Sequence, residues 1–343
     1  MPHLPAQPAF SNTSSPARFV QATPQAAPAV NPSGQSAERE RAFIQPDASA
    51  PPVLELDVLS LNTFALPAPL GKNIAARSER IGRSLGEYEI VGLQETFSKD
   101  SRYLAVGTEA AGIQVERYAP TDRRLLNSGL TTLSKYEIVE QAFKPFTYAS
   151  HADALAQKGV SFTRVRLPEG QMLDVYNTHF QAMRDKADAP HEKLGLKMMG
   201  LLFPGYAMPR DEIRAHDAEV LKAFVEEHDA GHPVIITGDF NTQESDALYG
   251  VLKDSLGLND AFRELHPEDP GYTSDGKTNP YKSNPQKRKR VDYIFYRDGQ
   301  HLDLKPIQSQ VVFDKPVEGL FVSDHYGVHT RFQLLPKADP KTP

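Results

Sequence analysis

From residue 53 onward, short apolar runs alternate with segments whose apolar residues recur at helical spacing. The run "VIITGDFN" is too apolar for an exposed edge and fits a strand covered on both faces. Two other runs are joined by a Pro-Glu-Gly turn, as in a hairpin. The pattern predicts strands at residues 53–64, 89–96, 126–138, 160–167, 172–180, 234–241, 291–297 and 327–335.

Helical periodicity is clearest at residues 211–228, where apolar residues share one face and acidic residues crowd the first turn. A second helix is expected at 72–86, with Ile74 and Ile81 on one stripe, and a third near 244–256. Hairpins mixed with helical connections predict an α/β fold, a four-layer sandwich of two mostly antiparallel sheets flanked by helices.

The first 52 residues have a different composition, rich in Pro, Ala, Ser and Gln. Such a segment cannot bury enough apolar surface to offset its ordering entropy, so we expect residues 1–52 to be disordered. Neither a Sec signal nor a run of about 20 apolar residues is visible. We therefore expect one large folded domain at 53–336, followed by a disordered tail at 337–343.

Composition narrows the chemistry that the chain can use. It contains no cysteine, which excludes disulfides, a thiol nucleophile and thiolate metal sites. The net charge of −6 is unfavourable for a protein that tracks nucleic acid. A local basic patch can override that charge, and the run "QKRKR" at 286–290 is the candidate.

Polar side chains lie at the ends of the predicted strands. Each alone has an ordinary structural explanation, as a turn residue, a helix-start acid, a core histidine or a partner of the basic run. Together they offer oxygen ligands for a hard cation, two imidazoles, and a carboxylate that can orient one of them. The set is Asn62, Glu95, His179, Asp239, Asn241, Asp292, Asp324 and His325.

Asp239 and Asn241 illustrate the ambiguity of single motifs. At i and i+2 after a buried strand, they would point to the same side and mount a polar pair. Asp and Asn also commonly form turns after strands. The wider set favours a magnesium site with Glu95 at its centre, which suits phosphate ester hydrolysis. The same oxygen ligands accept manganese or calcium to different degrees.

The ordered series "SLNTF", "GLQET", "NTHFQA", "GDFNT", "RVDYIFY" and "VSDHYGV" resembles the endonuclease/exonuclease/phosphatase superfamily, whose fold is that of DNase I. Within it the chain is most similar to neutral sphingomyelinases, through "LNSGLTTLSKYEI", the Lys-Gly pair of "QKGVSFTRVRL", and "NTHFQA" followed by a helix. The resemblance covers about residues 53–336. It implies a metal-dependent phosphodiesterase that splits sphingomyelin into ceramide and phosphocholine.

The resemblance also implies roles for the strand-end residues. Glu95 would ligate magnesium, assisted by Asn62 and, through water, by Asp324. Asp239 and Asn241 would hold the attacking water and a phosphoryl oxygen.

His325, oriented by Asp292, would act as the general base or contact the phosphate, and Asp239 is the alternative base. His179 would stabilise the transition state or assist departure of the ceramide oxygen. Lys158 resembles the lysine of a family switch segment, although a solvated loop cation is the alternative. Asn127, in the segment that carries the closer match, is expected to bind substrate.

Two features depart from the simplest family pattern. The insertion from Leu194 to Met208 is strongly apolar, which fits either a membrane-docking element or a helix packed on the sandwich. Some secreted relatives carry an aromatic hairpin before the final Ser-Asp-His. Residues 298–322 of this chain contain only Phe313 and Phe321 among Phe, Tyr and Trp, so we do not expect that hairpin here. Tryptophan is absent, but 13 Tyr and 17 Phe allow choline recognition.

Three other functions are alternatives for this sequence. A DNase I-like endonuclease would use the same residues and the "QKRKR" run, but the net charge and the apolar insertion argue against it. A phosphoinositide phosphatase would carry a Trp-Asn-x-Gly start and a Cys-Asp-Arg run, and this sequence contains neither motif. A catalytically dead binding module would not need a complete set of acids and histidines. We expect a monomer that contacts membrane phospholipid and is either a secreted bacterial effector or a cytoplasmic enzyme.

Overall fold

The computed structural model describes most of the chain from residue 54 onward. The expectations for the N-terminal segment, for the C-terminal tail beyond Lys337, and for the apolar insertion before Met208 fall outside this part of the chain. The described residues are 54–67, 70–106, 114–117, 126–183, 208–282 and 284–337.

One sheet has six strands in the order β13–β14–β1–β2–β4–β3. β1 (Leu54–Asn62) and β2 (Ile90–Gln94) pair in parallel at its centre, and the other neighbours are antiparallel. The remaining strands are β3 (Gln114–Arg117), β4 (Thr131–Ser134), β13 (Leu302–Val312) and β14 (Gly327–Pro336).

The other six-stranded sheet has the order β5–β6–β7–β8–β12–β9. Here β7 (Met172–His179) and β8 (Val234–Asp239) form the parallel pair. The antiparallel strands are β5 (Glu137–Pro145), β6 (Gly159–Arg166), β9 (Asn259–Asp260) and β12 (Asp292–Arg297). A separate small ribbon consists of β10 (Ser274–Asp275) and β11 (Arg288–Lys289).

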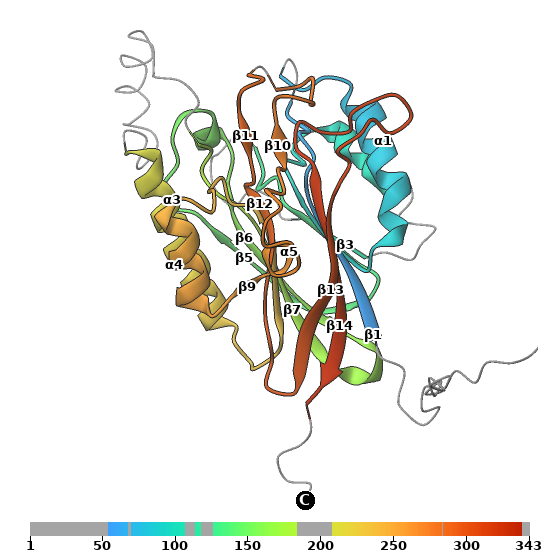
Figure 1. Cartoon of the computed structure of the whole chain (residues 1–343), viewed down its shortest axis with the longest axis vertical. Coiled ribbons are helices and arrows are strands. Elements are labelled where there is room, and N and C mark those ends of the chain that lie inside the picture. The colour runs from blue at the N-terminus through green and yellow to red at the C-terminus, as the bar shows by residue number, and fades with distance from the viewer. Residues whose placement is uncertain are drawn as a thin grey trace, which may run out of the picture. The chain divides into compact units, whose positions relative to one another are not determined.

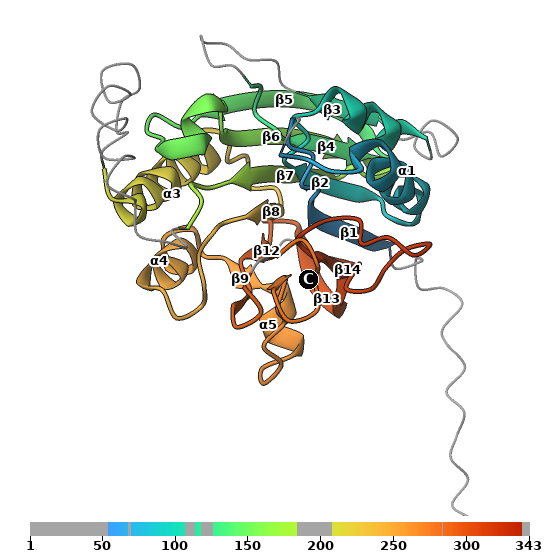
Figure 2. The same ribbon diagram turned by 90° about the horizontal axis from the view of Figure 1, so that it is seen from above.

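Helices cover the outer faces of the two sheets (Figures 1 and 2). α1 (Ile74–Ser84) lies on the first sheet, and α3 (Arg210–Glu227) and α4 (Ala247–Leu256) lie on the second. Among the described residues, no helix is long and apolar enough to cross a bilayer. The short helices are η1 (Leu85–Glu87), η2 (Lys99–Ala105), η3 (His151–Leu155), η4 (Pro168–Gly170) and α5 (Ala261–Leu265).

Strand alternation divides the core into three apolar clusters, one between each pair of neighbouring layers. In β1, Val58 faces the other sheet while Leu59 faces α1. In β8, Ile235 faces the first sheet while Ile236 faces α3 and α4. Because both faces of these central strands are covered, they are continuous apolar runs. The predicted four-layer α/β sandwich is confirmed.

The sheets approach each other closely where small or polar residues lie face to face. Gly92 of β2 lies against Thr237 of β8, and an added Cβ at Gly92 would come within 1.9 Å of Thr237 Oγ1. Beside it, Gln94 Nε2 donates to Asn177 Oδ1 at 2.8 Å, and Asn177 Nδ2 donates to Leu93 O at 3.0 Å. Buried amides therefore tie the two sheets together next to the strand ends.

The predicted strands and helices are found within a few residues of their expected bounds, with one exception. The single strand expected at 126–138 is wrong, since β4 ends at Ser134 and β5 begins at Glu137 after a tight turn in which Tyr136 N donates to Ser134 Oγ. β13 was not predicted, because it is a sheet-edge strand that mixes buried and exposed positions and contains no long apolar run.

Candidate active site

The strand ends singled out in the sequence converge at one end of the sandwich, the upper end in Figure 1. β1, β2, β7 and β8 all finish there, because β1 and β2 are parallel and so are β7 and β8. β12 begins there because it runs antiparallel to β8. β14 begins there because it is antiparallel to β1. The rigid sheets therefore bring together side chains that are far apart in sequence.

Asn62 bridges two of the carboxylates of the site, those of Glu95 and Asp239. Its Nδ2 donates to Glu95 Oε1 at 3.1 Å and to Asp239 Oδ2 at 3.0 Å, while its Oδ1 accepts from Phe64 N. Asn62 and Asp239 are buried, and Glu95 adopts a left-handed backbone conformation with φ of 57°. That conformation is uncommon for a residue with a side chain, and such residues cluster at functional sites.

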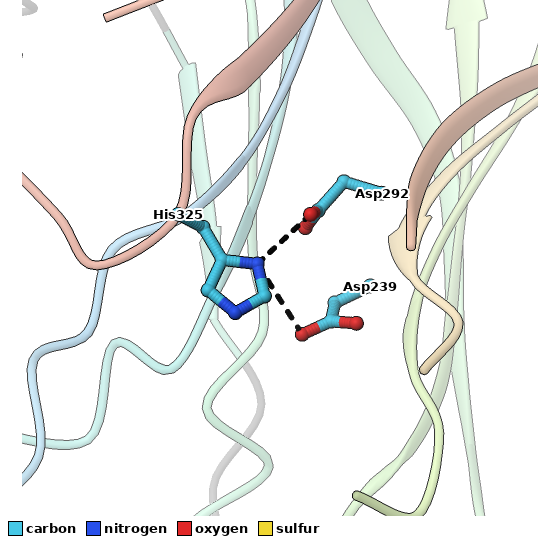
Figure 3. Close-up of side chains that lie close together, drawn as sticks. All are labelled: Asp239, Asp292 and His325. Carbon is cyan, nitrogen blue, oxygen red and sulfur yellow. Dashed lines mark hydrogen bonds and ion pairs between the residues drawn. The ribbon is translucent and has the colours of Figure 1, made fainter. Parts of the chain in front are cut away.

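Asp292 orients His325. The Asp292 Oδ2 atom lies 2.8 Å from His325 Nδ1, and Asp239 Oδ2 lies 3.8 Å from the same nitrogen (Figure 3). Burial alone would lower the pKa of His325, but Asp292, helped by Asp239 and Asp324, raises it to about 9. The alternative, in which Asp292 is a partner of the basic run, is wrong: Arg288 pairs with Asp275 and Arg290 with Asp260.

His179 and Lys158 form a second buried pair. Lys158 Nζ lies 3.0 Å from His179 Nε2 and donates to Phe180 O, while Asp153 Oδ2 lies 3.0 Å from the same amine. Burial, Lys158 and His325 hold the pKa of His179 well below its usual value. Since an ammonium only donates, His179 Nε2 accepts and its proton is on Nδ1. Lys158 is therefore not a solvated loop cation.

Asn241 lies just past the end of β8. Its φ of 48° breaks the strand alternation, so it is related to Asp239 by a turn in which Asn241 N donates to Asp239 Oδ1 at 3.0 Å. Its side chain donates to Phe180 O and accepts from Met183 N. Asn241 thus fixes the segment after His179 against the end of β8. The sequence left two explanations open, and the turn is the one observed.

Glu95 and Asp324 face each other across the centre. Burial and then repulsion by Asp324 raise the pKa of Glu95 to about 7. Burial opposes ionisation of Asp324 too, but Lys282, whose Nζ lies 2.7 Å from Asp324 Oδ2, and His325 lower its pKa. Glu95 Oε2 and Asp324 Oδ1 are buried and find no hydrogen-bond partner among the residues described.

These oxygens fit a divalent cation. Two mutually repelling carboxylates with unsatisfied buried oxygens are a ligand set suited to a hard ion. Asp239, Asp292 and His325 also lie close enough together to hold an ion. However, the Nδ1 atom of His325 is already hydrogen-bonded to Asp292, which favours an orienting role for that group. The chain thus contains a site for a metal ion.

The hydrogen bonds described for Asn127 are made with neighbouring loop residues and not with the strand-end residues. Its Oδ1 accepts from Gly129 N, and its carbonyl accepts from Gln157 N, next to Lys158. Gly129 O in turn accepts from Thr96 N, the residue after Glu95. Asn127 therefore shapes the loop between Glu95 and Lys158, and its expected contact with substrate stays a prediction.

Three residues of the site were not found from the sequence. Arg77 of α1 is buried and donates to Thr63 O, Phe64 O and Val322 O, which flank Asn62 and Asp324. Ser323 Oγ donates to Asn62 O, and Lys282 pairs with Asp324. An Arg in a charged helix and a Lys in a polar loop give no sequence signal for such long-range contacts.

A family model described as the Endonuclease/Exonuclease/phosphatase family matches residues 59–325. The match spans the strand-end residues from Asn62 to His325, so the chain belongs to this family. The predicted membership is confirmed.

Individual relatives refine this picture. A Drosophila melanogaster protein named among the neutral sphingomyelinases is 30% identical, over 84% of this chain and 63% of its own length. A Mycobacterium tuberculosis sphingomyelinase is 26% identical, over 74% of this chain and 47% of its own length. The chain thus spans less than two thirds of each of these relatives, and the predicted similarity to sphingomyelinases is confirmed.

The fold is also found among solved structures. The crystal structure of D. rerio TDP2 complexed with single strand DNA product is 20% identical, with a TM-score of 0.63. It covers 81% of this chain and 99% of its own. At this identity the likeness concerns the fold, which is the predicted DNase I-like sandwich.

Proposed function

We propose that the chain is a magnesium-dependent phosphodiesterase that hydrolyses sphingomyelin to ceramide and phosphocholine. The observation that carries the proposal is the convergence of Glu95, His179, Asp239 and His325 at one end of the sandwich, with Nε2 of His179 3.9 Å from Glu95 Oε1 and 3.6 Å from Asp239 Oδ2. Sphingomyelin as the substrate is supported by the relatives named as sphingomyelinases.

The chain's own groups divide the work of hydrolysis. Asp239 and His325 lie next to each other, and this pair receives the proton of the attacking water. Asp292 fixes the ring of His325 through Nδ1, which leaves Nε2 to face the reacting atoms. Lys158, which donates to Nε2 of His179, supplies the positive charge with which this pair stabilises the phosphoryl oxygens as the leaving oxygen departs.

The proposal also covers the identity of the metal ion and the residues that hold it. Glu95 would hold magnesium directly, with Asn62 close by and Asp324 acting through water; manganese is the alternative ion. When bound, the ion supplies charge neutralisation for the phosphate. Glu95→Gln is expected to raise the magnesium concentration needed for half-maximal binding by calorimetry, whereas Glu137→Gln, an exposed control, is expected to leave it unchanged.

The deciding experiment measures phosphocholine release from sphingomyelin vesicles with magnesium and with EDTA, beside nicking of a plasmid by the same preparation. Magnesium-dependent phosphocholine with intact plasmid supports the proposal. Nicked plasmid with untouched lipid would replace the lipid substrate by nucleic acid, while failure of both would favour a binding module.

Matched variants tie the result to the site. His179→Ala and Asp239→Ala are each expected to lower turnover at least about 100-fold. His216→Ala, at a half-buried position of α3 away from the strand ends, is expected to keep normal turnover. Membrane contact through 194–208, a monomeric state, and secretion as a bacterial effector rather than a cytoplasmic location stay predictions beside this function.

A further inference from the structure

Residues 273–282, which we name the clamp segment, lie against the loop that carries His325. The segment contains β10, at the upper end of the sandwich in Figure 1. Its first residue, Thr273, accepts a hydrogen bond of 2.7 Å from Tyr326 N through its carbonyl oxygen. Because Tyr326 directly follows His325, this bond fixes the backbone next to the ring.

The clamp segment also holds the chain that precedes His325. Asn279, which is buried, donates from Nδ2 to Ser323 O at 2.9 Å. Lys282 Nζ lies 2.7 Å from Asp324 Oδ2. The loop is therefore bound to the clamp segment on both sides of His325.

Thr273 contacts the other member of the pair as well. Its Oγ1 accepts from Asp292 N at 3.2 Å and from Val291 N at 3.2 Å. Asp292 is the first residue of β12, and its Oδ2 lies 2.8 Å from His325 Nδ1. One threonine therefore holds the backbone of Asp292 through its hydroxyl and the backbone beside His325 through its carbonyl.

The environment of Thr273 suits a residue that keeps two groups at a fixed separation. It is fully buried, and its backbone N donates to Lys289 O at 3.0 Å, so its N, O and Oγ1 atoms are all in hydrogen bonds. A β-branched side chain has few χ1 rotamers, which keeps the hydroxyl in place. Loss of the hydroxyl would leave two buried N–H donors at the start of β12 without this acceptor.

We propose that Thr273 is a positioning residue of the active site, which sets the distance between the Asp292 carboxylate and the His325 ring. It touches neither group and acts through the backbone of each. The inference rests on the proposed function, in which this pair receives the proton of the attacking water. Because a displacement of about 1 Å can lower a rate about 100-fold, loosening Thr273 should be visible in turnover.

The test uses two replacements that differ in the hydroxyl. Thr273→Val removes the hydroxyl and keeps a β-branched side chain, whereas Thr273→Ser keeps the hydroxyl and loses the methyl group. The matched control is Thr163→Val in β6, because Thr163 is also fully buried and its Oγ1 finds no hydrogen-bond partner in the described part of the chain. Should Thr273→Val not show native circular dichroism, Thr273→Ala takes its place, since it leaves room for a water at the two N–H groups.

The first measurement is of kcat and KM for the full-length proteins, below their thermal midpoints. Thr273→Val is expected to lower kcat about 10- to 100-fold with KM nearly unchanged, because the pair acts on the reacting water and not on substrate binding. Thr273→Ser is expected to restore kcat to near the wild-type value, and Thr163→Val to retain it. A wild-type kcat in Thr273→Val, or an equal loss in the serine variant, overturns the proposal.

The second measurement needs no turnover. The Nδ1 proton of His325, held against Asp292, gives a downfield proton resonance in NMR spectra, assigned by its absence in His325→Asn. We expect this resonance to move or vanish in Thr273→Val and to persist in Thr273→Ser and Thr163→Val. An unchanged resonance in folded Thr273→Val would refute the positioning role. Failure of the proposed phosphodiesterase is seen separately, as absent phosphocholine release by the wild-type protein.

Discussion

Nη1 of Arg77 donates a hydrogen bond of 2.9 Å to the carbonyl oxygen of Val322, a residue 245 positions later in the chain. The same nitrogen donates to Thr63 O at 2.7 Å. One buried guanidinium therefore joins the loop that follows Asn62 to the loop that precedes Asp324. The spacing between these two site residues depends on a helix that carries no catalytic group.

Replacing Arg77 by Met or Lys is expected to lower turnover about 10- to 100-fold, because small displacements of positioned groups have effects of this size. A lysine keeps the charge but cannot span several carbonyls. kcat, KM and the midpoint of thermal unfolding are measured together. At temperatures below the midpoint of thermal unfolding, where the fold persists, we expect kcat of the variants to be lower than that of the wild type.

Arg80 provides the matched control on the same helix. It donates to Val317 O and Ala76 O, so it joins α1 to a different part of the loop between β13 and β14. Arg80→Gln is expected to retain activity. If both variants lose turnover equally, Arg77 stabilises the helix in general and does not position the site.

Asp292→Asn is expected to lower kcat/KM about 10²- to 10⁴-fold, the range for losing acid–base assistance. Asparagine keeps the shape but removes the charge that raises the pKa of His325, so burial should dominate and that pKa should fall. Titration of the His325 ring by NMR measures this directly. Asp275→Asn, which affects the Arg288 pair and the adjoining turn at Lys277, should leave the ring unchanged. A normal His325 titration in Asp292→Asn would contradict the orienting role.

Stability should depend on pH through Asp217 of α3. Burial raises its pKa to about 8, opposed by a hydrogen bond from Gln181 N and by Lys158 and Arg214, and reinforced by Asp153. In the unfolded chain this acid ionises near 3.8, so between about pH 4 and pH 8 only the folded state keeps the proton. This contribution is complete below pH 4 and is lost as the pH rises to about 8.

Asp217→Asn removes that dependence while its side-chain oxygen can still accept from Gln181 N. The variant's thermal midpoint should fall less than that of the wild type between pH 5 and pH 8.5. Parallel curves for the two proteins would show that Asp217 is ionised in the folded state across this range.

Gly92→Ala should destabilise the sandwich by about 1–3 kcal/mol or more, because the new methyl group would overlap Thr237 of the opposite sheet. Gly250→Ala in α4, where the added Cβ meets nothing within 4 Å, should instead be neutral or stabilising by up to about 1 kcal/mol. Urea unfolding of both variants measures the difference. Equal stability would mean that the sheets can move apart without loss.

The sequence predicted the elements whose pattern is strong. α3 buries Ile213, Leu221 and Phe224 on one face, as its periodicity indicates, and the apolar run of β8 is covered on both sides. The strand-end residues could also be predicted to meet, because a sheet brings the ends of its strands to one edge.

What could not be predicted depends on contacts between distant segments. The partner of Asp292 was uncertain, since the neighbouring arginines offered charges closer in sequence than His325. Arg77 was hidden in a helix where a cation normally faces solvent. The left-handed turn at Asn241 also has no signal beyond residue type. Because of this turn, the strand does not continue to Asn241, and the strand alternation that was expected to place Asn241 on the same side as Asp239 does not apply.

Asp239 and Asp292 are direct register partners in the antiparallel pair β8–β12. The hydrogen-bond ladder between β8 and β12 therefore sets their separation. A slip of even one residue in this register would send every side chain of the strand to the opposite face. The connection between the two strands, which carries α4 and α5, has no part in that register. Apart from Thr273, which bonds to Asp292 N, and Lys282, which pairs with Asp324, that connection can therefore change in length without altering the separation of Asp239 and Asp292.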